Sequence, residues 1–558
     1  MAGEATRGGA SEGVRIPTLL RTLWYLRPEQ IAGQLKRALS GREVKPRAFS
    51  GEAPRAAFEA PRAAWLPAPP HARAASAARI ELIHRAQGSA SAAEIDWASN
   101  AHGPLFAYHL HQFDWARDAQ LAPAERLAAI ESWIARHPRG VGWDSGPISL
   151  RAFAWTKLLT TRAALPEAAD TARIRASLAA QLETLAANLE THLSGNHLLW
   201  NLLALVFAGA AHAGAAADRW LAFAPRLAAE LREQLLESGL HYERSPMYHG
   251  LLLENALDLV NVDASAPGRL PRELASELRK TAARMLGALA VVTHPDGEIA
   301  LFGDSAFGIA HVPARLAEYA AALGIAPIAP KEPGVLRDAG IARLEDAALC
   351  CIVTASRPWP EHQPGHAHCD ALSFELSVGG ERVVTDSGVS EYAPGAKRDA
   401  SRATRSHAVV QIDGREQAEC WAAHRIGGRP DVALVRAEPA RFVEAVCAGW
   451  ATPEVLHRRR FTLEAGALAI ADHFDAPAPH ARAFLPLAPG LEPALAGRAA
   501  TITLRRGGAL RIALPEALAW RIERAPYFPE FGLEEERAVL VGEGENVVRA
   551  EWRFDVLR

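Results

Sequence analysis

Hydrophobic residues between residues 124 and 323 recur at spacings of three and four, which is the pattern of amphipathic helices. Further helices are predicted from Leu198 to Val206 and from Leu251 to Val260. Short connections between these segments predict stacked helical hairpins, and the periodicity alone permits either a bundle or a solenoid. The clearest apolar stripe comprises Ile174, Leu178, Leu182, Leu185, Leu189 and Leu193.

Beyond a predicted linker at Lys331 to Gly334, apolar and polar residues alternate in short runs. Turn residues separate these runs at intervals that are typical of a β-sandwich. We therefore expect a helical domain followed by an antiparallel β-sandwich, with the binding site in the cleft between them. The predicted strands are Leu349 to Val353, Leu372 to Val378, Val409 to Ile412, Phe442 to Cys447, Phe461 to Leu463, Leu468 to Ala471, Thr501 to Leu504 and Val547 to Trp552.

The N-terminal part of the chain shows neither a continuous helical periodicity nor a continuous alternation of apolar and polar residues. Residues 1–14 are polar and rich in glycine and alanine, which predicts a disordered tail. Two helical segments are predicted between Pro17 and Ser40, and residues 42–88 predict an extended arm because they are rich in proline, alanine and arginine. The predicted division is a tail and wrapping arm (1–88), a helical domain (89–330) and a β-sandwich domain (335–558).

Composition and charge argue against several classes of protein function. The 558 residues are 49% hydrophobic, enough for more than one core, and the formal net charge of -3 provides no field that would recruit nucleic acid or an anionic membrane. Five cysteines without C-x-x-C spacing argue against a disulfide framework and against a cysteine zinc site. No apolar run approaches the ~18 residues of a membrane span, and no secretory leader is visible, which predicts a cytoplasmic location.

The segment from Gly365 to His407 carries the densest candidate chemistry. His366 and His368 flank one residue, and an extended backbone would place both imidazoles on one face. A predicted hairpin turns at Gly379-Gly380 and returns to Asp386. Such a cluster suits a metal site or an acid/base pair, although two ordinary polar histidines on a loop are the plain alternative.

Upstream candidates lie at helix boundaries. Asn196 and His197 stand at a predicted helix start, where an asparagine ordinarily caps, but where free N–H groups also favour an anion. Residues 241–249 form a polar run in which Pro246 is predicted to break the helix and expose the segment, with Tyr248 as its strongest functional candidate. Arg151 is expected to meet either a substrate carboxylate or a structural ion-pair partner.

Four motifs in this order resemble the signature of the heparinase II/III family of polysaccharide lyases: Asn196-His197, Ser245 to His249, Gly303-Asp304 and Gly365 to His407. The resemblance implies a multidomain α+β fold in which an incomplete α/α toroid precedes the antiparallel β-sandwich. It implies β-elimination, in which the proton at C5 of a uronic acid is removed and the oxygen at C4 leaves. The implied substrate is an anionic polysaccharide or oligosaccharide, such as a glycosaminoglycan or alginate.

The resemblance also implies roles for individual residues. Asn196 and His197 would hold the substrate carboxylate, and Tyr248 and His366 would carry the protons. The predicted substrate-binding residues are Arg151, Tyr242, Glu243, His249 and Arg402. His368, Asp386 and His407 match positions that bind zinc in some members, so a single structural zinc ion is expected. Two positions depart from the family pattern, Gly195 in place of an asparagine and Cys369 in the histidine loop.

Two other functions are alternatives for the same residues, an epimerase and a non-catalytic glycan-binding protein. A uronate C5-epimerase removes the same proton and returns it on the other face. A non-catalytic glycan-binding protein of capsule or exopolysaccharide biosynthesis would need no tyrosine and histidine proton pair. The joint presence of Asn196, Tyr248, His366 and His407 therefore argues against it. The resemblance implies a periplasmic location, in conflict with the missing leader, and it allows a homodimer.

Overall fold

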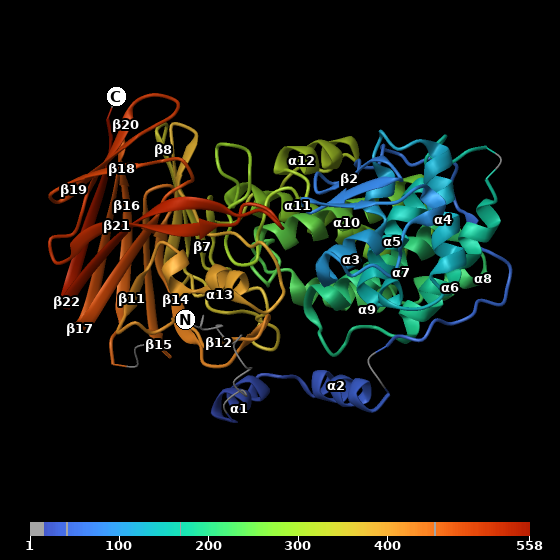
Figure 1. The fold of residues 1–558 in the computed structure, drawn as a ribbon, viewed down its shortest axis with the longest axis horizontal. Helices are drawn as coiled ribbons and strands as arrows, with labels where there is room; N and C mark the ends of the chain where they lie inside the picture. Colours follow the sequence, from blue (N-terminus) through green and yellow to red (C-terminus); the bar gives the residue numbers. More distant parts are fainter. Residues whose placement is uncertain (1–15, 41–42, 168, 451–453, 558) are drawn as a thin grey trace, which may run out of the picture.

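The computed structural model describes residues 16–40, 43–167, 169–450 and 454–557. A helical domain and a domain of β-sheets lie side by side along the longest axis of the molecule (Figure 1). The predicted disordered tail at 1–14 lies outside the described residues. Among the described helices, none is long and apolar enough to cross a membrane.

The helical domain is the predicted incomplete toroid, built from helices that pack in sequence-adjacent pairs. Helix α7 is almost wholly buried and apolar on all sides, as expected of a helix surrounded by other helices. The predicted stripe forms the buried face of α6 from Ile174 to Leu185, whereas its last two members, Leu189 and Leu193, lie beyond the end of this helix at Ala187. The helices are α3 (Gly103–Gln112), α4 (Pro123–Arg136), α5 (Ser145–Leu159), α6 (Thr171–Ala187), α7 (Gly195–Ala211), α8 (Ala215–Leu221), α9 (Ala224–Gln234), α10 (Pro246–Ser265), α11 (Arg272–Val291) and α12 (Pro313–Ala322).

The second domain is an antiparallel sandwich of two sheets, as predicted. The smaller sheet has the order β10-β9-β8-β7-β6, with bounds Glu381–Val384, Ser373–Val378, Leu349–Thr354, Ile341–Glu345 and Val335–Leu336. Its Phe374 packs edge-on against Phe461 and Phe554 of the larger sheet, so the two inner faces share one core. The predicted turn at Gly379-Gly380 joins β9 to β10, and both glycines have the positive φ of a tight hairpin.

The larger sheet is dominated by two strands that are far longer than the sequence predicted. Strands β17 (Ala467–Pro486) and β22 (Glu535–Leu557) pair along most of their length. Only their most regular stretches, near Leu468 and Val547, were recognisable in the sequence, because a register shift between His473 and Ala478 interrupts the alternation. The remaining strands of this sheet are β11 (Val410–Ile412), β14 (Pro430–Glu438), β15 (Phe442–Gly449), β16 (His457–Glu464), β18 (Pro493–Ala496), β19 (Ala499–Thr503), β20 (Ala509–Ala513) and β21 (Ala519–Tyr527).

The N-terminal arm is more structured than the sequence predicted. Helices α1 (Ile16–Trp24) and α2 (Pro28–Ser40) run beneath the two domains (Figure 1). The arm then forms a three-stranded sheet from β2 (Ala72–Ser76), β3 (Arg79–Leu82) and β4 (Arg85–Gly88). The buried positions of β2 are alanines, which are too small to give a clear hydrophobic alternation.

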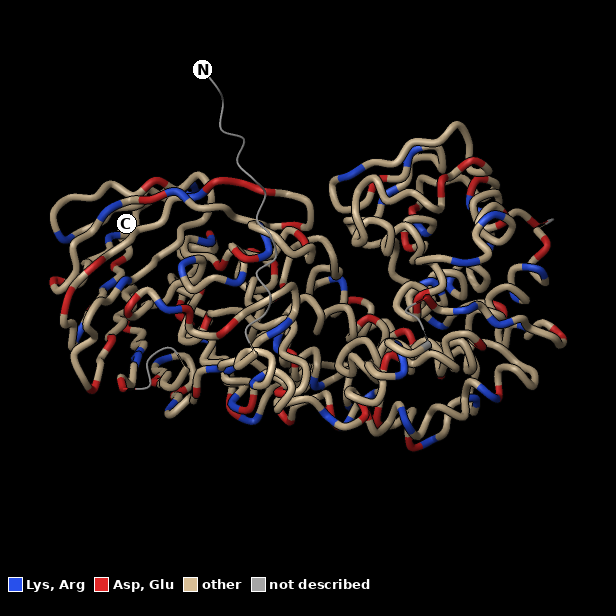
Figure 2. Tube along the Cα trace, turned by 60° about the horizontal axis from the view of Figure 1, so that its bottom comes forward, with Lys and Arg blue, Asp and Glu red and all other residues tan. Residues whose placement is uncertain are grey.

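Charged contacts hold the domains together. Arg382 on β10 donates to the carboxylate of Asp296 at 3.0 Å and to the carbonyl oxygen of Ile299, both from the helical domain. The same guanidinium contacts Glu375 on β9. Elsewhere, basic and acidic residues are interspersed over both domains (Figure 2).

Candidate active site

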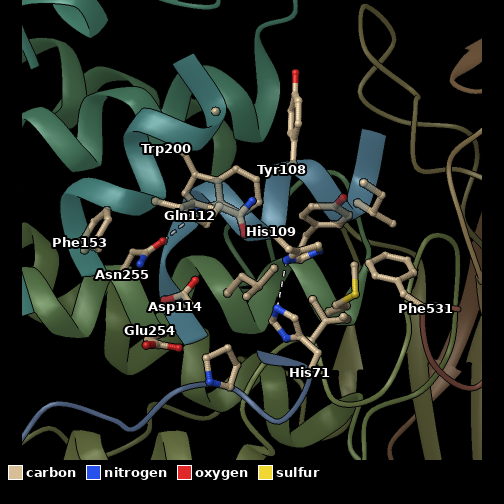
Figure 3. A pocket seen from close by; sticks show the side chains of 18 of the residues that line it. His71, Tyr108, His109, Gln112, Asp114, Phe153, Trp200, Glu254, Asn255 and Phe531 are labelled. Atoms are coloured by element: carbon tan, nitrogen blue, oxygen red, sulfur yellow. Dashed lines mark hydrogen bonds between the residues drawn. The ribbon is translucent and has the colours of Figure 1, made fainter. Parts of the chain in front are cut away.

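A cavity of about 270 Å³ lies where the helical domain, the sandwich and the N-terminal arm meet. The helical domain supplies most of its wall, including Trp200 and Asn255, whose side chains are joined by a hydrogen bond (Figure 3). Tyr392, His424 and Phe531 come from the second domain, and Pro69 and His71 come from the arm. This position matches the predicted interdomain site, and the cavity also includes Tyr248, His366 and His197.

Tyr248 owes its position to the start of α10. Pro246 occupies the first turn of the helix, where a missing N–H costs nothing, and the Ser245 hydroxyl accepts a hydrogen bond from the Tyr248 N–H. The prediction that Pro246 exposes this segment is wrong, because Tyr242, His249 and Tyr248 are all at least nine-tenths buried. The Tyr248 hydroxyl lies 2.8 Å from the hydroxyl of Tyr392. Burial, and then the nearby Asp304 charge, raise the pKa of Tyr248 far above its usual range.

Asp304 organises the histidine loop. Its two carboxylate oxygens accept from His366 Nδ1 at 2.8 Å and from His368 Nε2 at 2.9 Å. Arg398 donates to both oxygens from the other side. Burial alone would raise the pKa of Asp304, but Arg398 and the two histidines lower it well below its usual range. The predicted pair of imidazoles on one side of the chain is therefore present, although the loop itself is not a strand.

Because the Asp304 carboxylate accepts from Nδ1 of His366, Nε2 is the nitrogen without a proton in the neutral imidazole. The His366 ring lies 4.1 Å from the Tyr248 ring, measured between centroids. Nε2 lies 3.5 Å from the Glu243 carboxylate. The geometry thus places a proton acceptor and a neutral hydroxyl next to one another in the cavity wall.

The start of α7, where a substrate carboxylate was expected, is occupied by an acidic side chain of the protein itself, that of Glu243. The Glu243 carboxylate accepts a hydrogen bond from the Asn196 backbone N–H at 2.9 Å. Gly195 has φ +56, and a Cβ on it would lie 2.2 Å from that carboxylate, which explains why glycine departs from the family pattern here. The Asn196 side chain is buried, and neither of its amide atoms has a hydrogen-bond partner.

His197 is the most accessible of the predicted catalytic residues, with 32% of its side chain exposed. Its Nδ1 lies 3.3 Å from the carboxylate of Glu190. Burial would lower the pKa of His197, but Glu190 outweighs burial and the pKa is raised. An imidazole with a raised pKa thus reaches the cavity beside Trp200.

A second buried group could hold a metal ion. One ligand atom from each of His368, Asp386 and His407 lies within 4.8 Å of the other two. His368 Nδ1 and His407 Nε2 are buried and have no hydrogen-bond partner, while the other nitrogen of each ring contacts Asp304 or Asp386. A free ring nitrogen backed by a carboxylate is the arrangement of metal-binding histidines. Asp304, His366 and His424 form another such group, but both Asp304 oxygens are already engaged.

Four predicted substrate-binding residues do not reach this cavity. Arg151 is fully buried and donates to Gln181, His111 and Gly142, so its contacts are structural. His249 is bound between Met285 and His241, and Arg402 donates to three backbone carbonyls around residues 422–425. Tyr242 is buried and does not line the cavity. Glu243, the fifth, does not line the cavity either. Its carboxylate lies 3.5 Å from His366 Nε2 and accepts a hydrogen bond from the Asn196 backbone N–H.

Several site residues were not assigned roles from the sequence. Gly303-Asp304 and Arg398 were visible as motif residues, but their mutual contact joins positions 94 residues apart and could not be inferred. Tyr392 was likewise visible without a partner. His424, His71, His109 and the Lys157, Glu254 and Asp258 cluster gave no local signal, because isolated polar residues on amphipathic segments resemble ordinary surface.

The chain matches two family models that together span most of its length. The heparinase II/III N-terminus model matches residues 132–324, and the heparinase II/III-like C-terminal model matches residues 329–552. The chain therefore belongs to the heparinase II/III family. This confirms the predicted family and, with it, the prediction of a carbon–oxygen lyase that acts on polysaccharides.

Solved structures share the fold. Heparan sulfate lyase HepC from Pedobacter heparinus has 19% sequence identity and a TM-score of 0.56, covering 83% of this chain and 78% of its own. A crystal structure of heparinase III has 16% identity and a TM-score of 0.64, covering 83% and 79%. At these identities the likeness concerns the fold. No curated protein matches the chain.

Asp304→Asn tests the central contact of the site. The change leaves the buried Arg398 without its anionic partner, so the free energy of unfolding should fall by about 3 to 5 kcal/mol. His366 should also lose the tautomer that leaves Nε2 free, so activity should fall more than stability explains. The neighbouring exposed Asp399→Asn is the matched control. Chemical denaturation of both variants measures the effect, and equal stabilities would contradict it.

Proposed function

We propose that this protein cleaves a uronic-acid glycan by β-elimination, with His366 and Tyr248 as its two proton carriers. The observation that carries the proposal is the position of the His366 imidazole against the Tyr248 ring, 4.1 Å between centroids, in the wall of one cavity. Family membership supports the reaction class. The assignment of residues rests on their geometry.

The reaction needs three things from the protein. The proton at C5 is only weakly acidic because the adjacent carboxylate is already negative, so that carboxylate must be neutralised. A base must then take the C5 proton, and an acid must protonate the leaving oxygen at C4. His197 lines the cavity and its pKa is raised by Glu190, so it suits the carboxylate. The unpaired amide of Asn196, the adjacent residue in the chain, is buried and does not line the cavity.

The two proton roles can be divided. His366 Nε2 suits the base, because Asp304 holds the proton on the opposite nitrogen and stabilises the imidazolium that forms. Tyr248 suits the acid, because its raised pKa keeps the hydroxyl protonated in the resting enzyme. The hydroxyl of Tyr392 can orient that of Tyr248, since the two oxygens lie 2.8 Å apart.

His368, Asp386 and His407 would hold a zinc ion, as the resemblance implies. Two imidazoles and a carboxylate form a sound zinc ligand set. The ion would brace the loop that carries His366 and supply rigidity to it. The orphaned nitrogens of His368 and His407 support this assignment, because leaving them buried and unpaired costs free energy.

The charges of the cavity favour a substrate without sulfate. Arg117 and Lys157 are the Lys and Arg residues among its described lining, and both are paired. Arg117 contacts Asp114 at 2.8 Å, and Lys157 contacts Glu254 at 3.1 Å and Asp258 at 2.6 Å. Burial lowers the pKa of His71, His109 and His424, so these rings are neutral. His197, whose pKa the Glu190 carboxylate raises, is the remaining lining residue suited to one substrate carboxylate, and it too lies beside an acid, 3.3 Å from Glu190.

A uronate C5-epimerase remains the second candidate, because it would use the same base and the same carboxylate contacts. The hydroxyl of Tyr248 could return the proton from the other face instead of protonating the C4 oxygen. An unsaturated product that absorbs in the ultraviolet distinguishes the lyase from the epimerase. A screen of uronate polysaccharides for this absorbance is the primary test.

Tyr248→Phe should lower kcat by two to four orders of magnitude, roughly the scale of a lost general acid. KM should change little, because the ring and the carboxylate contacts remain. Tyr108→Phe is the matched control, since Tyr108 also lines the cavity but bonds to Asp144 away from His366. A raised KM with unchanged kcat would mean that Tyr248 only binds sugar.

Purified protein should contain zinc, and Asp386→Ala should lose it together with several degrees of melting temperature, because a structural ion contributes to folding. Elemental analysis and thermal denaturation measure both. His473→Ala, at an exposed position in the same domain, should retain the metal. An active preparation free of transition metal would remove the zinc assignment and leave the roles of His366 and Tyr248 intact.

Sulfation should suppress turnover. A sulfate in this cavity would lack a cationic partner at a cost of about 3 kcal/mol, which corresponds to ~100-fold in kcat/KM. The measurement compares one uronate polymer before and after chemical sulfation, with absorbance as the readout. Faster cleavage of the sulfated form would contradict the charge argument.

A further inference from the structure

The N-terminal arm forms part of the cavity wall and is fixed to the helical domain there. The carbonyl oxygen of Pro67 accepts hydrogen bonds from Arg117 at 2.8 Å and from His311 at 3.2 Å. His71 contacts His109 Nδ1 at 3.1 Å through one ring nitrogen and the Gly308 carbonyl at 3.2 Å through the other (Figure 3). Pro69 and His71 both line the cavity.

The same arm continues to the sandwich domain. His84 contacts the carboxylate of Glu530 at 2.9 Å. The following loop approaches so closely that a Cβ on Gly532 would lie 2.3 Å from the carbonyl oxygen of Ile83. Phe531, from this loop, lines the cavity, and Phe307 of the helical domain donates to the carbonyl of Pro529. Three chain segments from three parts of the molecule thus close this side of the interdomain cleft.

A second bridge is made by the first two helices of the arm. Thr18 and Arg21 of α1 donate to Glu419 of the second domain. Gln30 of α2 donates to the carbonyl of Leu193 in the helical domain and to that of His362 beyond it. The arm therefore ties the two domains together at two places.

These contacts between the arm and the two domains limit which substrates can enter the cavity. A polymer that is cut in its interior must lie in a groove that is open at both ends. Here the described residues line a partly open cavity of about 270 Å³, slightly below the usual range for small-ligand sites, which begins at about 300 Å³. The arm, the loop at Gly308 and the loop at Phe531 meet in one side of the cavity wall, and the hydrogen bond between His71 and the Gly308 carbonyl joins two of them.

We propose that the N-terminal arm makes this enzyme exolytic, so that only a chain end enters the cavity and each turnover releases a short unsaturated product. The proposal rests on the lyase function proposed above and adds the mode of action. His71 is the residue of the arm that closes the wall, because it bonds to both His109 and the Gly308 carbonyl. It acts by limiting access and takes no part in proton transfer.

The test follows an accepted uronate polymer by absorbance and by size-exclusion chromatography together. An exolytic enzyme releases short unsaturated sugars from the first time points, while the remaining polymer shortens only in proportion to the product released. An interior cut would instead collapse the mean length of the polymer before short sugars accumulate, and this result would overturn the proposal. Absence of any unsaturated product would refute the lyase function itself, which separates the two failures.

His71→Ala tests the role of the arm. Removing the ring opens the wall, so longer unsaturated oligosaccharides should appear among the products. Arg79→Ala is the matched control, since Arg79 is exposed on β3 of the same arm and should leave the product lengths unchanged. Unchanged products from a folded His71→Ala variant would mean that the arm does not set the mode of action. If that variant does not fold, the wild-type product profile still decides the proposal.

Discussion

The carboxylate of Asp304 is the contact on which the rest of the site depends. It belongs to the helical domain, and its three partners, His366, His368 and Arg398, belong to the other domain. One buried anion therefore joins the domains, fixes the tautomer of His366 and orients His368 toward the candidate metal group. Removing a buried charge from such a network costs more than any single hydrogen bond, so domain assembly and catalytic geometry are coupled.

Local patterns were enough to predict the architecture. Helical periodicity and strand alternation each extend over many residues, and the change between them near Lys331 marks the domain boundary that the two family models also respect. The helix start at Asn196, the polar run at Tyr248 and the histidine loop were recognisable because each combines chemistry with a break in a regular pattern. The resemblance then supplied roles that no pattern contains.

The sequence could not predict which residues contact one another in the folded site. Arg151 was predicted to bind substrate, yet its guanidinium is satisfied by Gln181 and two backbone carbonyls, and those contacts depend on packing between helices. Glu243 was predicted to contact substrate, and it lies instead at the start of α7 behind His366. The three-stranded sheet of the arm escaped prediction because its strands are only four or five residues long and the buried positions of β2 are alanines, whose small side chains barely alter the pattern.

The arm, although distant in sequence from every catalytic residue, completes the cavity that those residues occupy. The arm and the catalytic residues of both domains thus meet at one cavity. The central claim is that His366 removes the proton at C5 and that this proton is not returned to C5. The most direct measurement is nuclear magnetic resonance of a uronate polymer treated in deuterated water. The account predicts a new double bond between C4 and C5 in the product, with the uncleaved residues keeping hydrogen at C5. Deuterium at C5 of intact chains, without a double bond, would contradict elimination and make the protein an epimerase.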